Sequence, residues 1–334
     1  MPIRLLTSVL LFWLFLPLQT VTASSPQNPL LTPDSVYLSR QGIHKFNRSN
    51  LEVEWSSLKG VETFEPVMGK DFIFVGSTQG LYALHGATGE IAWRIEHDKT
   101  IFSPSIDKQI FAGSLHGELY AINPKNGKVN WRQQLTGWIY SPVVLADLDQ
   151  LWSGGESHEA FLFDMKTGAI TKRIGLEQEA IFSPQRVDQS HIIFNLFSGR
   201  SVVIDVLTWI PVALLDGPPQ PRYLSFDRDT IYRANSDGSL VAFDKVSHKA
   251  IWNQSLVAHD LTMHPVTDGY MLLTDLEQTM VLLNLKTQHV VFKMEIDGDW
   301  FSPIQIDESH IVYFQNESLQ PNQIRAVKFD THDT

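Results

Sequence analysis

The sequence predicts an all-β fold: an eight-bladed β-propeller of four-stranded antiparallel blades, with seven blades as the alternative. Three observations predict it. A unit of about 40 residues recurs along the chain, apolar and polar residues alternate within each unit, and turn residues follow about every ten positions. Four short strands in about 40 residues form one propeller blade, and radial stacking buries faces that a single blade would expose.

The repeat is clearest in two adjacent segments. Residues 71–93 are DFIFVGSTQGLYALHGATGEIAW, and residues 109–131 are QIFAGSLHGELYAINPKNGKVNW. Each holds an alternating strand, a glycine-containing turn, a second strand, a TG or NG turn, and a strand ending in tryptophan. Residues 28–55 align with this frame before it, and weaker copies begin at Leu151, Ile192, Thr230, Tyr270 and His310. These units predict the eight blades.

Two features mark the ends of the units. A proline precedes most of them, at Pro66, Pro104, Pro142, Pro184, Pro265 and Pro303, and the sixth unit carries Tyr223 instead. After Phe329 few residues remain for a fourth strand. We expect either that residues 24–27 supply this strand or that the last blade keeps three strands.

Glycine and tryptophan take fixed places in the repeat. Gly89 and Gly127 stand in tight turns that need a positive φ angle. A tryptophan closes four units, at Trp55, Trp93, Trp131 and Trp252. Because it recurs with the repeat, we expect this indole to dock on the neighbouring blade rather than to stack on a ligand.

The first residues are typical of a secretory signal peptide. One positive charge, Arg4, precedes the apolar run of residues 5–18, and small residues follow up to Ala23. We expect cleavage after Ala23, which leaves residues 24–334 as a single propeller domain, and we expect no membrane-spanning segment in the mature chain. An uncleaved anchor is the alternative, but its apolar core is short for a membrane span.

The amino-acid composition limits the cellular compartments and the classes of partner that fit this protein. The sequence has no cysteine, so it has neither disulfides nor the cysteine that would carry a bacterial lipid anchor. The formal net charge of −11 argues against nucleic acid or anionic lipid as a partner. We expect a periplasmic protein, monomeric, that binds another protein.

The runs LYALHGATGEIAW and LYAINPKNGKVNW resemble the PQQ-like, quinoprotein-type propeller repeat. The resemblance extends over nearly the whole mature chain. Such repeats occur in quinoprotein dehydrogenases, in the BamB-like scaffolds of outer-membrane barrel assembly, and in the luminal domain of an unfolded-protein sensor kinase. The resemblance implies the blade and, from the BamB-like branch, a non-catalytic scaffold.

The sequence assigns no catalytic, cofactor-binding or metal-binding residue. A quinoprotein dehydrogenase needs a base, metal ligands and an aromatic floor for its cofactor, and no residue here can be matched to them. His259 and His264 have a spacing that fits no common zinc pair. Residues 147–149 and 297–299 carry paired aspartates that we interpret as solvated turns. We therefore expect no enzyme, with PQQ binding possible but unsupported by site residues.

A scaffold would bind its partner through loops on a propeller face. The least repeat-like segment is Asp216–Arg222, whose prolines predict a stiff loop that loses little entropy on binding. An irregular blade junction explains it equally well. Two other functions stay open: a PQQ-binding oxidoreductase or accessory protein of a quinoprotein system, and a luminal or periplasmic sensor or carbohydrate-binding module that uses Trp138, Trp209 and Trp300.

Overall fold

The chain folds into antiparallel sheets whose strands pair in the order in which they occur along the sequence. A computed structural model describes residues 29–39, 41–95, 98–177, 184–218, 221–259, 261–264, 269–275, 279–295, 300–306, 310–317 and 320–328. The expected signal peptide and residues 24–27 lie outside this part of the chain.

The first four sheets, blades 1 to 4, cover the N-terminal half. Blade 1 has β1 (Leu30–Leu31), β2 (Ser35–Ser39), β3 (Gln41–Asn47) and β4 (Val53–Glu62); blade 2 has β5 (Val67–Met68), β6 (Phe72–Ser77), β7 (Gly80–His85) and β8 (Ile91–Ile95). Blade 3 has β9 (Ser105–Ile106), β10 (Ile110–Gly113), β11 (Glu118–Ile122) and β12 (Val129–Gln134). Blade 4 has β13 (Val143–Leu145), β14 (Gln150–Gly154), β15 (Glu159–Asp164) and β16 (Ile170–Gly175), with a short 3₁₀ helix, η1 (Ala146–Leu148), between β13 and β14.

The remaining sheets follow the same plan. Blade 5 has β17 (Gln185–Arg186), β18 (His191–Asn195), β19 (Ser201–Asp205) and β20 (Pro211–Leu215); blade 6 has β21 (Pro221–Phe226), β22 (Thr230–Asn235), β23 (Ser239–Asp244) and β24 (Ala250–Ser255). Blade 7 has β25 (Thr262–Met263), β26 (Tyr270–Thr274), β27 (Thr279–Asn284) and β28 (Val290–Glu295). The last sheet has β29 (Trp300–Ile306), β30 (His310–Glu317) and β31 (Gln320–Lys328).

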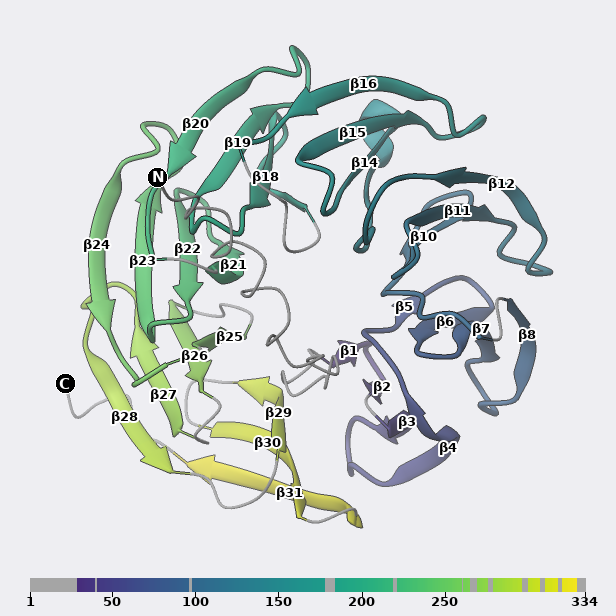
Figure 1. Ribbon diagram of the computed structural model, residues 1–334. Helices are drawn as coiled ribbons and strands as arrows, with labels where there is room; N and C mark the ends of the chain where they lie inside the picture. The colour runs from purple at the N-terminus through teal and green to yellow at the C-terminus, as the bar shows by residue number, and fades with distance from the viewer. Residues whose placement is uncertain are drawn as a thin grey trace, which may run out of the picture.

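The sheets stand side by side in a ring, with the first strand of each innermost and the last outermost (Figure 1). The prediction of an all-β propeller with four-stranded antiparallel blades is confirmed, but the predicted number of eight such blades is wrong. Within the described residues seven sheets have four strands, not eight, and β29–β31 form a further sheet of three. Residues 24–27 and 329–334, where a fourth strand for this sheet was expected or considered, lie outside the described part of the chain.

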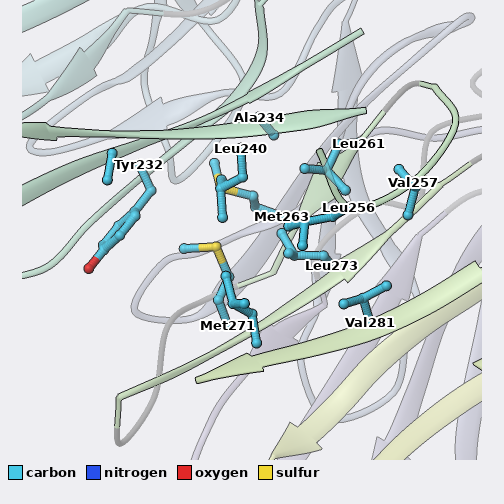
Figure 2. Packing of buried hydrophobic residues seen from close by; sticks show 12 residues of the cluster. Tyr232, Ala234, Leu240, Leu256, Val257, Leu261, Met263, Met271, Leu273 and Val281 are labelled. Carbon is cyan, nitrogen blue, oxygen red and sulfur yellow. The ribbon is translucent and has the colours of Figure 1, made fainter. Parts of the chain in front are cut away.

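The core lies between neighbouring blades. The two middle strands of a blade are buried on both faces, as in β6 and β7, so they are almost continuously apolar. Outer strands alternate instead; β12 has half-buried and exposed residues in turn. Figure 2 shows one junction, where Tyr232 and Leu240 of blade 6 pack with Met271 and Leu273 of blade 7. Each blade therefore depends on its neighbours for burial.

The predicted docking of the repeated tryptophans is confirmed at the first three junctions. Each indole Nε1 donates a hydrogen bond to a turn carbonyl of the next blade: Trp55 to Gly86 O at 3.1 Å, Trp93 to Pro124 O at 3.1 Å, and Trp131 to Met165 O at 3.0 Å. Trp252 packs against the core between blades 6 and 7. The indole thus connects each of these blades to the next, and we call this contact the joint; it agrees with the recurrence of tryptophan in the sequence.

A glycine receives each of these three indoles. Gly89, Gly127 and Gly168 have φ angles of 73°, 70° and 74°. A Cβ atom at these positions would lie only 2.5 to 2.7 Å from the tryptophan ring of the preceding blade. The turn therefore needs glycine both for its backbone conformation and for the space that the ring fills.

Within the described residues no helix is long and apolar enough to cross a membrane.

Candidate protein-interaction surface

Loops of blades 4 and 5 lie around the start of the segment that the sequence singled out. We call this group the loop cluster: Glu177 after β16, Phe197 and Arg200 between β18 and β19, and Asp216–Pro218 after β20. The connection from β20 to β21 is described at residues 216–218 and again from residue 221. The ends of blades 4 and 5 and an inner turn of blade 5 thus contribute to one surface.

Arg200 ties the loops together. Its Nη1 lies 2.5 Å from Glu177 Oε2, and its Nε lies 3.2 Å from Asp216 Oδ1. The Asp216 side chain remains 82% exposed and the other two are about half exposed. Such exposed ion pairs add little to stability, so their role here is to orient charged groups at the surface.

A buried arginine holds the backbone beneath this cluster. Arg233 on β22 is fully buried, and it donates hydrogen bonds from Nη1 to Leu215 O at 2.9 Å and from Nη2 to Asp216 O at 2.8 Å. Its guanidinium carbon lies 5.2 Å from the centroid of the Phe243 ring. Burial lowers the pKa of Arg233 to about 10, so the side chain is still a cation at neutral pH.

Gly217 makes room for this guanidinium. A Cβ atom at Gly217 would lie 1.4 Å from Arg233 Nη2, so no larger residue fits while Arg233 is in place. Two carbonyl contacts and one steric requirement therefore fix the loop where it leaves β20. The stiffness predicted for the segment from its prolines stays a prediction, because Pro219 and Gln220 lie outside the described residues.

Phe197 is the apolar member of the loop cluster. Its side chain is 50% exposed, although it lies in a turn between two strands that are otherwise buried. The corresponding turn residue is polar in blades 2, 4 and 6, as Thr78, Glu156 and Ser236, and is the smaller apolar Leu115 in blade 3. The same turn carries Arg200, and aromatic residues and arginine are both enriched at protein–protein interfaces.

Comparison with known proteins agrees with this architecture. Residues 77–171 match a family model described as outer membrane protein assembly factor BamB. The crystal structure of BamB from Moraxella catarrhalis superposes with a TM-score of 0.73 at 16% identity, covering 92% of this chain and 95% of that chain. Both comparisons are consistent with a PQQ-like, BamB-like β-propeller.

Other structures share the fold with the BamB-like propeller. The computationally designed Ika8 protein aligns with a TM-score of 0.77 at 11% identity, covering 91% of this chain and 96% of that one. Dihydro-heme d1 dehydrogenase NirN, in complex with DHE, aligns with a TM-score of 0.68 at 14% identity, covering 81% of this chain and 66% of that one. No curated protein matches the sequence. At such low identities the superpositions show the fold alone.

The residues considered for chemistry do not come together in the BamB-like propeller. His259 is exposed, whereas His264 is buried with Nε2 3.1 Å from Thr274 Oγ1. Asp147 pairs with Arg186 of blade 5 at 2.5 Å, and this bond lowers the pKa of its carboxyl group. Among described residues no group of three histidine or acidic side chains is placed to hold a metal ion. Residues 297–299 lie outside that set.

The aromatic side chains considered for sugar binding have structural surroundings. Trp209 packs against the core cluster between blades 4 and 5, with Lys172 over its ring. Trp138 is half-buried, and its main-chain N–H lies 3.3 Å from Glu156 Oε2. The side chain of Trp300 is outside the described part. Packing therefore explains Trp209 without a ligand.

Sequence reasoning found the segment at Asp216 but missed Phe197, Arg200 and Arg233. A signal for Arg233 was present, because the repeat frame places it where other blades carry small or apolar residues: Val75, Ala112, Ser153, Phe194 and Leu273. A charge at this position breaks the repeat pattern of a buried strand. The contacts of Arg233 with blade 5 depend on how the blades stack, which only the structure gives.

Proposed function

We propose that this BamB-like propeller is an exported, non-catalytic scaffold that binds another protein in the periplasm through the loop cluster. The observation that carries the proposal is the half-exposed ring of Phe197 in the same turn as Arg200, whose guanidinium pairs with Asp216, the residue whose carbonyl Arg233 holds from below. A preformed surface binds with a small entropy cost. The family match to an assembly factor supports a scaffold, and the PQQ-like repeat by itself specifies the blade rather than chemistry.

Affinity capture from a periplasmic extract tests the proposal. Wild-type protein is compared with Phe197→Ala and Arg200→Glu variants, and with Ile91→Ala as the matched control, because Ile91 is 49% exposed on the outer strand of blade 2. We expect one protein whose recovery falls at least tenfold with either loop variant and is unchanged with the control, since hot-spot truncations cost about 2 kcal/mol or more. Equal recovery with all four proteins would contradict the proposal.

Export and cofactor content need separate tests. N-terminal sequencing of protein from the periplasm is expected to begin at Ser24.

The alternative of a quinoprotein is tested by titration with PQQ and Ca²⁺ while absorbance is recorded. Saturable binding at micromolar PQQ would favour the oxidoreductase over the scaffold.

A further inference from the structure

The outer strand of blade 5 exposes an apolar row. Ile210, Val212 and Leu214 are 58%, 47% and 43% exposed, and Leu207 in the preceding turn is 59% exposed. We call these four residues the β20 edge. In Figure 1 β20 lies at the outside of the ring, and β19 is its only paired neighbour among the described strands. On its other side β20 pairs with no strand in the part of the chain that the structure describes.

In the six other four-stranded blades the residue equivalent to Leu214 is always polar or charged, and the residue equivalent to Ile210 is so in all but blade 4, which has Ala169. Leu214 lies one residue after the outer-strand position that holds tryptophan in blades 1 to 3. Its equivalents in the other blades are Ser56, Arg94, Arg132, Arg173, Asn253 and Lys293. The place of Ile210 is taken by Glu52, Glu90, Lys128, Ala169, Lys249 and His289. Charges on an outer strand prevent another strand from pairing with it. Blade 5 lacks this protection at both positions.

The size of the β20 edge favours a short strand over a whole second protein copy. Four half-exposed aliphatic side chains offer roughly 400 Å², about half of the ~800 Å² that each partner buries in a standard stable interface. Added strands gain affinity from main-chain hydrogen bonds and specificity from alternate side chains, so a small area suffices. Pro211 has no N–H, so we expect these hydrogen bonds mainly from Val212 onward.

The net charge of the chain further limits which kind of partner can bind the β20 edge. A second copy would carry the same net charge of −11, which opposes self-association. A segment with basic flanking residues is attracted by that charge, while alternate apolar residues meet Val212 and Leu214. The two requirements together define one chemistry: an extended segment with apolar residues at every second position and lysine or arginine at its ends.

We infer that the β20 edge binds such an extended, basic-flanked segment of a partner protein by adding it as a fifth strand to blade 5. The inference rests on the proposed scaffold function and gives it a second contact surface. The loop cluster then recognises a folded partner surface, and the β20 edge holds an extended part of the chain that it carries.

Fluorescence anisotropy with a labelled peptide, KKVTVTVKK, tests the inference on the mature protein. The control peptide KKVTPTVKK keeps the charge and removes a central N–H. Leu214→Arg is the test variant, and Ile251→Arg is matched to it, because Ile251 is 54% exposed on the outer strand of blade 6. We expect saturable binding with a Kd on the order of 10–100 μM, raised at least tenfold by Leu214→Arg and within twofold of wild type for Ile251→Arg.

Hydrogen exchange adds a readout independent of affinity, since a paired strand protects the β20 amides. Three results would overturn the inference: no saturable binding, equal binding of the proline peptide, or wild-type protein that sediments as a dimer and becomes a monomer with Leu214→Arg. Phe197→Ala should leave peptide binding unchanged. Capture of the partner protein by the Phe197→Ala variant therefore tests the loop cluster, whereas binding of the peptide tests the β20 edge. Either proposal can fail without the other.

Discussion

Lys172 Nζ lies 4.2 Å from the centroid of the Trp209 ring, at the junction between blades 4 and 5. This pair reverses the arrangement of the first three junctions, where the tryptophan lies on the outer strand and the glycine in the turn of the next blade. Lys172, opposite Leu162, occupies the outer-strand position that holds tryptophan in blades 1 to 3. Trp209, with a φ angle of 61°, occupies the turn position that holds glycine in blades 2 to 4. The indole thus fills the same junction from the opposite blade.

Exchanging the pair tests this inverted joint. Lys172→Trp alone should lower the free energy of unfolding by about 1–3 kcal/mol, because two indoles then compete for one space. Trp209→Gly alone should cost about 3 kcal/mol through lost packing. The double variant should recover most of both losses, since it restores the arrangement of Trp131 and Gly168. Urea unfolding of the four proteins measures the coupling, and additive losses would show that the residues do not share the space.

The glycine joint predicts a large effect from one methyl group. Gly127→Ala places a Cβ 2.7 Å from the Trp93 ring at a φ angle of 70°, so we expect a loss of about 1–3 kcal/mol in the free energy of unfolding. Gly175→Ala is the control, because its Cβ meets nothing within 4 Å. Chemical denaturation compares the two. A Gly127→Ala protein as stable as the control would mean that the indole has room to shift.

Arg233 is expected to need its guanidinium shape. A lysine at this position offers one compact ammonium group and cannot reach the Leu215 and Asp216 carbonyls in the same geometry. Arg233→Lys should therefore cost about 1–3 kcal/mol and speed hydrogen exchange at Asp216 and Gly217. Arg132 is half exposed and lies 3.5 Å from the buried Glu118, which Lys99 also pairs at 2.7 Å, so Arg132→Lys should cost less than ~0.5 kcal/mol. Unchanged exchange at Asp216 would show that the loop is held by other contacts.

His264 predicts acid sensitivity. Burial lowers its pKa to about 3, so the folded protein keeps this imidazole neutral while the unfolded chain protonates it near pH 6.5. Its contribution to stability is complete above pH 6.5 and is lost as pH falls toward 3, at up to ~1.4 kcal/mol per pH unit. The exposed His289 provides the control. His264→Gln should flatten the dependence of unfolding free energy on pH in this range, whereas His289→Gln should not.

An NMR titration of the His264 ring checks the same prediction without a variant. The imidazole signals should show no protonation down to about pH 4 in the folded protein. A titration midpoint near 6.5 would contradict it.

The candidate surface was only partly accessible to sequence reasoning. The proline segment at Asp216 stood out because it departs from the repeat, and Phe197 departs from it less visibly. Glu177 gave no signal, because it approaches Arg200 across two blades and 23 residues of chain. Such a contact follows from the rotation of one blade relative to the next, which no local pattern contains.

The sequence by itself determined the blade. Alternation sets which residues face a neighbouring blade, glycine sets the turns, and the repeated tryptophan sets the joint, because each is a local property of about 40 residues. The tertiary structure alone decided how the joints differ: tryptophan on glycine at the first junctions, Trp209 under Lys172 at the next, and Arg233 across blades 5 and 6. Within the described residues it also showed seven four-stranded sheets and one of three strands, since strand pairing depends on the tertiary fold and not on the repeat alone.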